Sequence, residues 1–283
     1  MKSIPEKPDL DYLKKEAKQL RTLHRNADVS CCDRMRHFDT VYSDKTDAEI
    51  FSSKFSILDA QRITAREYGF SSWAKLKRCI ESMHKNFNAA LHEELIHMKD
   101  RDAEIRQKLL DEGVLYDAYH PEMEKVHNEH AERLKAIIAE HGWPGTSMVG
   151  IDGCRAAWRI AQFAISQPEF QKQSLKLLQA AVEEGEAPSR MLAFLTDIIL
   201  FHSNKPQKYG AIADWDDDGH LTYGEVEDED KLDQRRGLVG LGPIGPELVA
   251  HEQEVKKEGR RPPEDLEKYK QKAEAWAKRV GWK

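Results

Sequence analysis

Apolar residues recur three and four positions apart along most of the chain, a spacing that places them on one face of an α-helix. Residues 1–82 predict a small helical module with an irregular stretch at 26–55. Its second helix begins at Ser56 and ends at Gly69, and its third begins at Ser71 or Ser72, because serine caps helices well and glycine ends them. The stripes of its three helices are Leu10, Leu13, Ala17 and Leu20; Leu58, Ala65 and Tyr68; and Trp73, Leu76, Ile80 and Met83.

Helical periodicity continues through the central part of the chain. A helix ends near Gly113, the next begins at Pro121, and another begins at Asp152 or Gly153. Short loops join these segments, so consecutive helices are expected to pack on one another. The expected spans are 91–113, 121–141, 152–165, 170–182 and 188–202.

The pattern changes after residue 203. Residues 209–215 and 221–226 predict two strands joined by a tight turn at Asp217, Asp218 and Gly219. The sequence therefore predicts a mainly α fold with one small β-hairpin, divided into residues 1–82, 83–255 and 256–283. The last segment is an amphipathic helix ended by Gly281, with the stripe Leu266, Tyr269, Ala273, Trp276 and Val280.

The hairpin carries the sharpest motif in the chain. Residues 214–225 fill the fixed positions of a twelve-residue calcium loop, which would use five ligands and a sharp turn at Gly219. Pro206 and Gly210 interrupt the entering helix that an EF-hand needs, so we favour a hairpin without metal and keep calcium as the alternative. The ligands would be Asp214, Asp216, Asp218, the carbonyl of His220, and Glu225.

Composition narrows the function classes. Charged residues make up 33% of the chain and the mean hydropathy is −0.72, without an apolar run of membrane-spanning length or a secretory signal. We therefore expect a cytoplasmic protein without a membrane role. Residues 1–82 hold 16 Lys and Arg against 13 Asp and Glu, too small an excess for nucleic-acid binding. The four cysteines lack metal-site spacing and are expected to be ordinary thiols.

Polar residues on buried stripes need partners, because an unpartnered buried amide or imidazole is destabilising by about 1–3 kcal/mol. His127, Gln162, Gln171 and Asp197 occupy such positions. One hypothesis brings them together in a pocket for an anionic or amide-bearing ligand, which Tyr209, Arg235 and Arg236 would help to hold. The alternative, which we favour, is a structural network that cross-links helices.

An enzymatic alternative also rests on His127. With Glu124 or His120 as its acid–base partner, it would serve a hydrolase or a metal-dependent enzyme. Glu94 with His97, and Glu124 with His127, have the spacing of di-iron helical bundles. A chain rich in Glu and His produces that spacing by chance, so we give this reading little weight.

Two stretches resemble known bacterial sequences. Residues 58–77 resemble a short module that often precedes ankyrin repeats, which implies attachment to a partner, although no ankyrin repeat follows. Residues 116–248 resemble a bacterial family of unknown function, whose members carry His where this chain has Phe163 and usually lack an acid at the position of Glu225. That likeness rests on the segments 120–127, 141–144, 157–158, Gln162, 168–171, 195–197, 206–210, 214–219 and 233–236.

The sequence therefore predicts a cytoplasmic bacterial protein that binds a small molecule or a peptide. A protein partner would dock on residues 1–82 or 256–283, whose apolar stripes need cover. No cofactor is predicted apart from the calcium alternative at 214–225.

Overall fold

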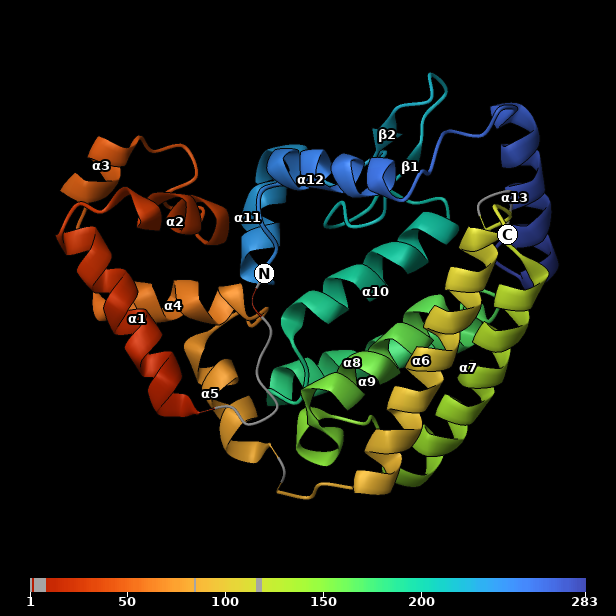
Figure 1. Cartoon of the computed structure of the whole chain (residues 1–283), viewed down its shortest axis with the longest axis horizontal. Coiled ribbons are helices and arrows are strands. Elements are labelled where there is room, and N and C mark those ends of the chain that lie inside the picture. Colours follow the sequence, from red (N-terminus) through yellow and green to blue (C-terminus); the bar gives the residue numbers. More distant parts are fainter. Residues whose placement is uncertain (1, 3–8, 84, 116–118) are drawn as a thin grey trace.

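The computed structural model describes residues 2, 9–83, 85–115 and 119–283, and it confirms a mainly α fold with one small hairpin (Figure 1). The N-terminal module contains α1 (Leu10–Arg25), α2 (Cys32–Phe38), α3 (Asp47–Ser52), α4 (Ile57–Glu67) and α5 (Trp73–Ser82). Ser56 caps α4 through a capping box with Asp59, and Ser72 rather than Ser71 caps α5. The serine signals therefore located both helix starts.

Two predictions for this module were wrong. Residues 26–55 are not irregular, since they form a 3-10 helix (Val29–Cys31), α2 and α3. These helices are too short to show periodicity, although Thr46 and Glu49 form a capping box at the start of α3. Leu58 is 70% exposed, and α4 buries Ala60 and Ile63 instead.

The central helices are α6 (Ala89–Asp111), α7 (Pro121–His141), α8 (Thr146–Phe163), α9 (Pro168–Glu184) and α10 (Ser189–His202). In Figure 1, α6 and α7 stand side by side at one edge of the molecule, and α8 packs against both. Helix α8 begins at Thr146, earlier than the predicted Asp152 or Gly153. Gly150 interrupts it with a φ of 68°, a left-handed conformation that glycine adopts without a side-chain clash.

The hairpin is shorter than predicted. Strands β1 (Asp214–Trp215) and β2 (Leu221–Thr222) pair antiparallel, with Asp214 opposite Thr222 and Trp215 opposite Leu221. Two helices that the sequence pattern did not predict follow, α11 (Leu232–Leu238) and α12 (Ile244–Lys257). Helix α12 carries little buried apolar surface, with Val255 buried, so it has no clear stripe.

The final helix, α13 (Leu266–Val280), docks on its own chain. It stands beside the hairpin and the start of α7 (Figure 1), and Ala277 and Trp282 are buried in the central core. The indole of Trp282 donates to the carbonyl of Ile165 at 2.7 Å. Among the described residues, no helix is long and apolar enough to cross a membrane.

Candidate functional site

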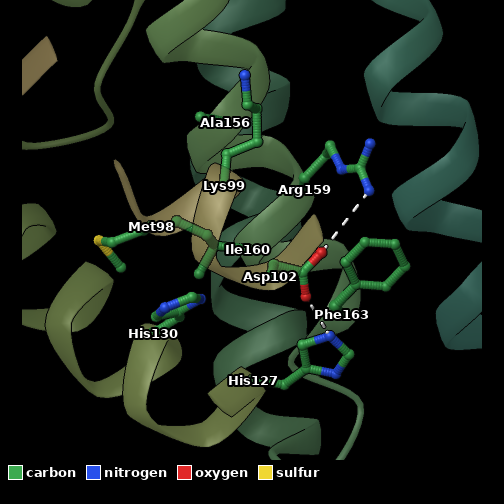
Figure 2. A pocket seen from close by; sticks show the side chains of 9 residues that line it. All are labelled: Met98, Lys99, Asp102, His127, His130, Ala156, Arg159, Ile160 and Phe163. Atoms are coloured by element: carbon green, nitrogen blue, oxygen red, sulfur yellow. Dashed lines mark hydrogen bonds and ion pairs between the residues drawn. The ribbon is translucent and has the colours of Figure 1, made fainter. Parts of the chain in front are cut away.

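A chain of polar groups runs through the interior between α6, α7 and α8. His127 Nε2 lies 2.7 Å from Asp102 Oδ1, and Arg159 extends toward the other oxygen at 3.8 Å (Figure 2). His127 Nδ1 lies 2.7 Å from the hydroxyl of Tyr119. Because the carboxylate can only accept, Nε2 donates to Asp102 and Nδ1 accepts from Tyr119. Both ring nitrogens of His127 are therefore occupied.

Aromatic stacking fixes the orientation of this histidine. Phe163 stacks on the His127 ring with centroids 5.1 Å apart, and Tyr119 stacks at 5.8 Å. Burial, helped by the charge of Glu124, raises the pKa of Tyr119 and keeps its hydroxyl protonated as a donor. Asp102 was not predicted as a site residue, although it is a polar residue in the buried stripe of α6, four positions after Met98.

The cavity beside Asp102 and His127 is small. Figure 2 shows it between Asp102, His127, His130 and Arg159, and its volume is about 10 Å³, room for one water molecule. The Nε2 atom of His130 is buried there without a hydrogen-bond partner among the described residues. Burial, with the positive charge of Arg101, lowers the pKa of His130 to about 4. This interior space is too small for an organic ligand.

A much larger cleft lies on the other side of Tyr119. It has a volume of about 570 Å³ and opens between α13, the hairpin and the ends of α7 and α10. Most of its wall is apolar, as in sites for small molecules. The aromatic residues of the wall are Tyr119, Phe201, His202, Trp215, Tyr269 and Trp276, and its cationic residues are Arg260, Arg261, Lys272 and Arg279.

The aromatic wall is held by contacts between elements. The ring of Trp276 in α13 packs edge-on against Tyr119, with centroids 5.6 Å apart, and lies tilted against His202, with centroids 5.3 Å apart. The guanidinium of Arg260 lies over the ring of Trp215 at 5.8 Å. Burial lowers the pKa of His202 to about 4, so this ring is neutral at neutral pH. Side chains from α10, β1, α13 and the loops before α7 and α13 thus meet in one surface.

Glu124 contacts the final helix, α13, and is not a partner of His127. Its carboxylate accepts from Arg279 at 2.8 and 2.9 Å, from Ser166 at 2.7 Å and from the Trp276 indole at 3.4 Å. Burial raises the pKa of Glu124, but Arg279 and Ser166 outweigh it, and the net shift is downward. His120 caps α7, with its Nδ1 accepting from the backbone N–H of Glu122. Neither predicted partner is hydrogen-bonded to His127 in the described structure.

The other residues predicted for the shared pocket lie in two further places. The Gln171 amide donates to the carbonyls of Ala161 and Gln162, which ties α9 to α8. None of Gln162, Gln171 or Asp197 lines the space beside His127. The Gln171 amide nitrogen and Asp197 bond to separate stretches of backbone, and His127 bonds to the side chains of Asp102 and Tyr119, so the structure does not bring these groups together.

A second polar cluster holds residues 206–213 in place. The buried Asp197 accepts from the backbone N–H groups of Lys208, Tyr209 and Ala211. Burial raises the pKa of Asp197, while these donors and Arg236 limit the rise. Arg236 is 1% exposed and donates to the carbonyls of Tyr209, Gly210 and Gly242 and to Glu247.

Two neighbours complete this cluster. The side chain of Gln207, which sequence reasoning did not single out, donates to the carbonyls of Ile212 and Tyr223 and accepts from two backbone N–H groups. The half-buried Arg235 donates to the carbonyls of Lys208, Glu227 and Asp228. All these partners are protein groups, so the cluster serves as a structural clamp on the backbone.

The acidic loop forms a hairpin turn. Asp216, Asp218 and His220 place one potential ligand atom each within 4.8 Å, whereas Asp214 and Glu225 are not in that group. Asp216 Oδ1 accepts from the backbone N–H groups of Asp218 and His220. Asp214 accepts from its neighbouring backbone N–H at 2.9 Å, and burial raises its pKa. The flanks of an EF-hand are missing, since strands rather than helices enter and leave the turn.

Comparison with known proteins identifies a family but no activity. A family of unknown function, DUF6624, matches residues 89–254, which span α6 to α12. The match begins earlier than the predicted 116–248 because it includes α6, the helix that carries Asp102. Neither the curated proteins nor the solved structures give a match. The match covers more than half of the sequence, and the chain therefore belongs to the family of unknown function DUF6624.

Proposed function

We propose that this protein binds a small molecule that has an aromatic or other flat apolar body and a negatively charged group. The aromatic cleft beside Tyr119 would be the site. The observation that carries the proposal is the combination of an open volume of about 570 Å³ with an aromatic wall and four cationic side chains. Ligand pockets have volumes of about 300–1,000 Å³ and mostly apolar walls, with a few polar groups that set specificity.

The aromatic wall favours a flat ligand. Trp215, Tyr269 and Trp276 are only partly buried, so part of each ring faces the cleft and can stack on a guest. Stacked aromatic pairs contribute about 0.5–1.5 kcal/mol beyond the area that they bury. The neutral state of His202 lets it serve as a further apolar surface.

The cationic side chains favour a negative charge on that ligand. Arg279 is already paired with Glu124, but Arg261 and Lys272 have no ion pair among the described residues. The acid in the wall, Asp214, has a pKa raised by burial, which makes its charged form less favourable there. Attraction for an anion therefore comes mainly from Arg261 and Lys272.

The polar chain behind Tyr119 supports a binding role more than a catalytic one. A general base needs a free nitrogen within reach of its substrate, and both nitrogens of His127 have protein partners. Asp102 and His127 instead hold Tyr119 in the wall of the cleft. By its resemblance to the segment before ankyrin repeats, the N-terminal module would attach the protein to a partner in the bacterial cytoplasm.

Paired fluorescent probes test the proposal. The anion 1-anilinonaphthalene-8-sulfonate and the uncharged N-phenyl-1-naphthylamine share a ring system, so their difference in affinity reports the charge. We expect one molecule of the anion to bind to the folded protein, about tenfold more tightly than the uncharged probe. The proposal fails if the two probes bind equally or if neither binds.

Substitutions identify the side chains that cause this difference in affinity between the two probes. Lys272→Met and Arg261→Met keep long side chains but remove the charge, so each should weaken the anion and leave the uncharged probe unchanged. Lys176→Met, on the exposed face of α9 away from the cleft, is the matched control and should change neither. An equal loss in the control would place the anion elsewhere.

A further inference from the structure

One arginine between the N-terminal module and the central helices has no counterion among the described residues. Arg190 is in the first turn of α10, and its side chain crosses Gly69, where an added Cβ would lie 2.5 Å from Arg190 Cδ. Gly69 has a φ of +82°, which glycine tolerates, and it leaves room for the arginine. The side chain is therefore held in one direction by the fold.

The guanidinium of Arg190 has neither a hydrogen bond nor an ion pair with any described residue. Partly buried charges are normally paired, because removing a charge from water is unfavourable. A second guanidinium, that of Arg155, lines the same cavity and pairs with Asp152 at 3.3 Å. Burial, and then the charge of Arg155, lowers the pKa of Arg190. Two positive groups thus face one small space.

That space suits a small anion. Its volume is about 40 Å³, and the rest of its wall consists of Lys2, Tyr68, Ile151, Trp158, Pro188 and Met191. The indole N–H of Trp158 is already used, since it donates to the carbonyl of Met191 at 2.9 Å. The ammonium of Lys2 is held by Glu16 at 2.7 Å and Glu67 at 3.1 Å. Arg155 uses only Nη1 for Asp152, and the Arg190 guanidinium has no partner among the described residues, so these two groups are left to hold a ligand.

We propose that Arg155 and Arg190 form a binding site for a tetrahedral oxyanion of the phosphate type. Each guanidinium presents parallel N–H donors that match two oxygens of a phosphoryl group. The bound anion would lie between α8 and α10 beside Tyr68 of the N-terminal module, and it would neutralise the repulsion between the arginines. This site is separate from the aromatic cleft and does not depend on it.

Thermal unfolding of the full chain tests the site, with inorganic phosphate compared with chloride at equal ionic strength and pH. Because only the folded state has the site, phosphate at about ten times its Kd should raise Tm by about 3 °C. Arg190→Met and Arg155→Met should each abolish that rise. Arg25→Met, an exposed arginine of α1, should retain it. Circular dichroism would verify that each variant is folded.

The anion-free buffer supplies a second readout. Arg190→Met removes an unpaired charge but keeps the chain across Gly69, so the variant should melt at or above the wild-type Tm without phosphate and below it with phosphate. O-phosphoserine is the second probe: a Tm rise equal to that with phosphate means that the site accepts a phosphate ester, and no rise means that it selects the free anion. The proposal is overturned if phosphate has no specific effect on the wild type, or if Arg190→Met and Arg155→Met retain it.

Discussion

Arg236 is buried and Arg190 is partly buried, and the surroundings of these two arginines are opposite. Arg236 donates to three backbone carbonyls and to Glu247. Arg190 has no acceptor among the described residues and faces Arg155. The charge of Glu247 favours the charged form of Arg190 too, but its carboxylate is bound to Arg236 and to the backbone N–H of Gly242. A satisfied charge indicates structure, and an unsatisfied one indicates a place for a ligand.

The largest effect is expected at the satisfied arginine. Arg236→Met leaves three carbonyls and Glu247 without their donor, so we expect the free energy of unfolding to fall by about 3–5 kcal/mol. Urea unfolding measures the loss. Arg235→Met is the neighbouring control and should lose about 1 kcal/mol, because its bonds are exposed to water. Equal losses in the two variants would contradict the role assigned to Arg236.

His130 is a third buried cation-forming group, and it differs from arginine because it can release its proton. Its pKa is lowered from 6.5 to about 4 in the folded protein, so the unfolded chain binds the extra proton between those pH values. The stability that the protein has with His130 neutral is therefore complete above pH 6.5, and it is lost as the pH falls toward 4. We expect the loss to reach about 3 kcal/mol at most, and to disappear in His130→Leu.

Unfolding free energies measured from pH 7 to pH 4 check this prediction. The control is His97→Leu, which replaces an exposed histidine of α6 and should keep the wild-type pH dependence. An unchanged slope in His130→Leu would show that its burial does not destabilise the charged form.

Gln207 belongs to the same cluster of hydrogen-bonded polar groups as Arg236 and gives a second test of its role in stability. Gln207→Leu removes the side-chain partners of the carbonyls of Ile212 and Tyr223 and of two backbone N–H groups. We expect a loss of about 2 kcal/mol by urea unfolding. Gln179→Leu on the exposed face of α9 is the control and should change stability little. A loss as small as that of the control would mean that water replaces these bonds.

The smallest effect on stability is expected at Arg190, whose guanidinium has no acceptor among the described residues. Without phosphate, Arg190→Met should change the free energy of unfolding by less than about 0.5 kcal/mol, or raise it slightly. The same substitution type would then give opposite outcomes at Arg236 and Arg190. A loss of about 3 kcal/mol at Arg190 would instead reveal a structural partner for its guanidinium.

The sequence located most of the fold because its signals were local. Apolar spacing found the long helices, and Ser56 and Ser72 marked helix starts. Helices α2, α3, α11 and α12 escaped because each is short or carries little buried apolar surface. The hairpin turn was predicted from its Asp-Gly pair, but the strands are shorter since Asp197 and Gln207 bind the preceding backbone.

The candidate site was much less accessible to sequence reasoning. Its wall comes from elements far apart in the chain, and only the tertiary fold brings Tyr119 and Trp276 together. His127 was identified as a buried polar residue, but its partner Asp102 was not, although it follows Met98 on the same helix face. Asp197 and Arg236 were identified as residues of a pocket, whereas the structure gives them backbone partners.

Two-dimensional NMR of the tryptophan indole N–H groups tests the central claim, binding in the aromatic cleft, most directly. As 1-anilinonaphthalene-8-sulfonate is added, the signals of Trp215 and Trp276 should shift together and saturate. The signal of Trp73, in the N-terminal module, should stay in place. Shifts that spare Trp215 and Trp276, or that affect Trp73 equally, would contradict ligand binding in this cleft.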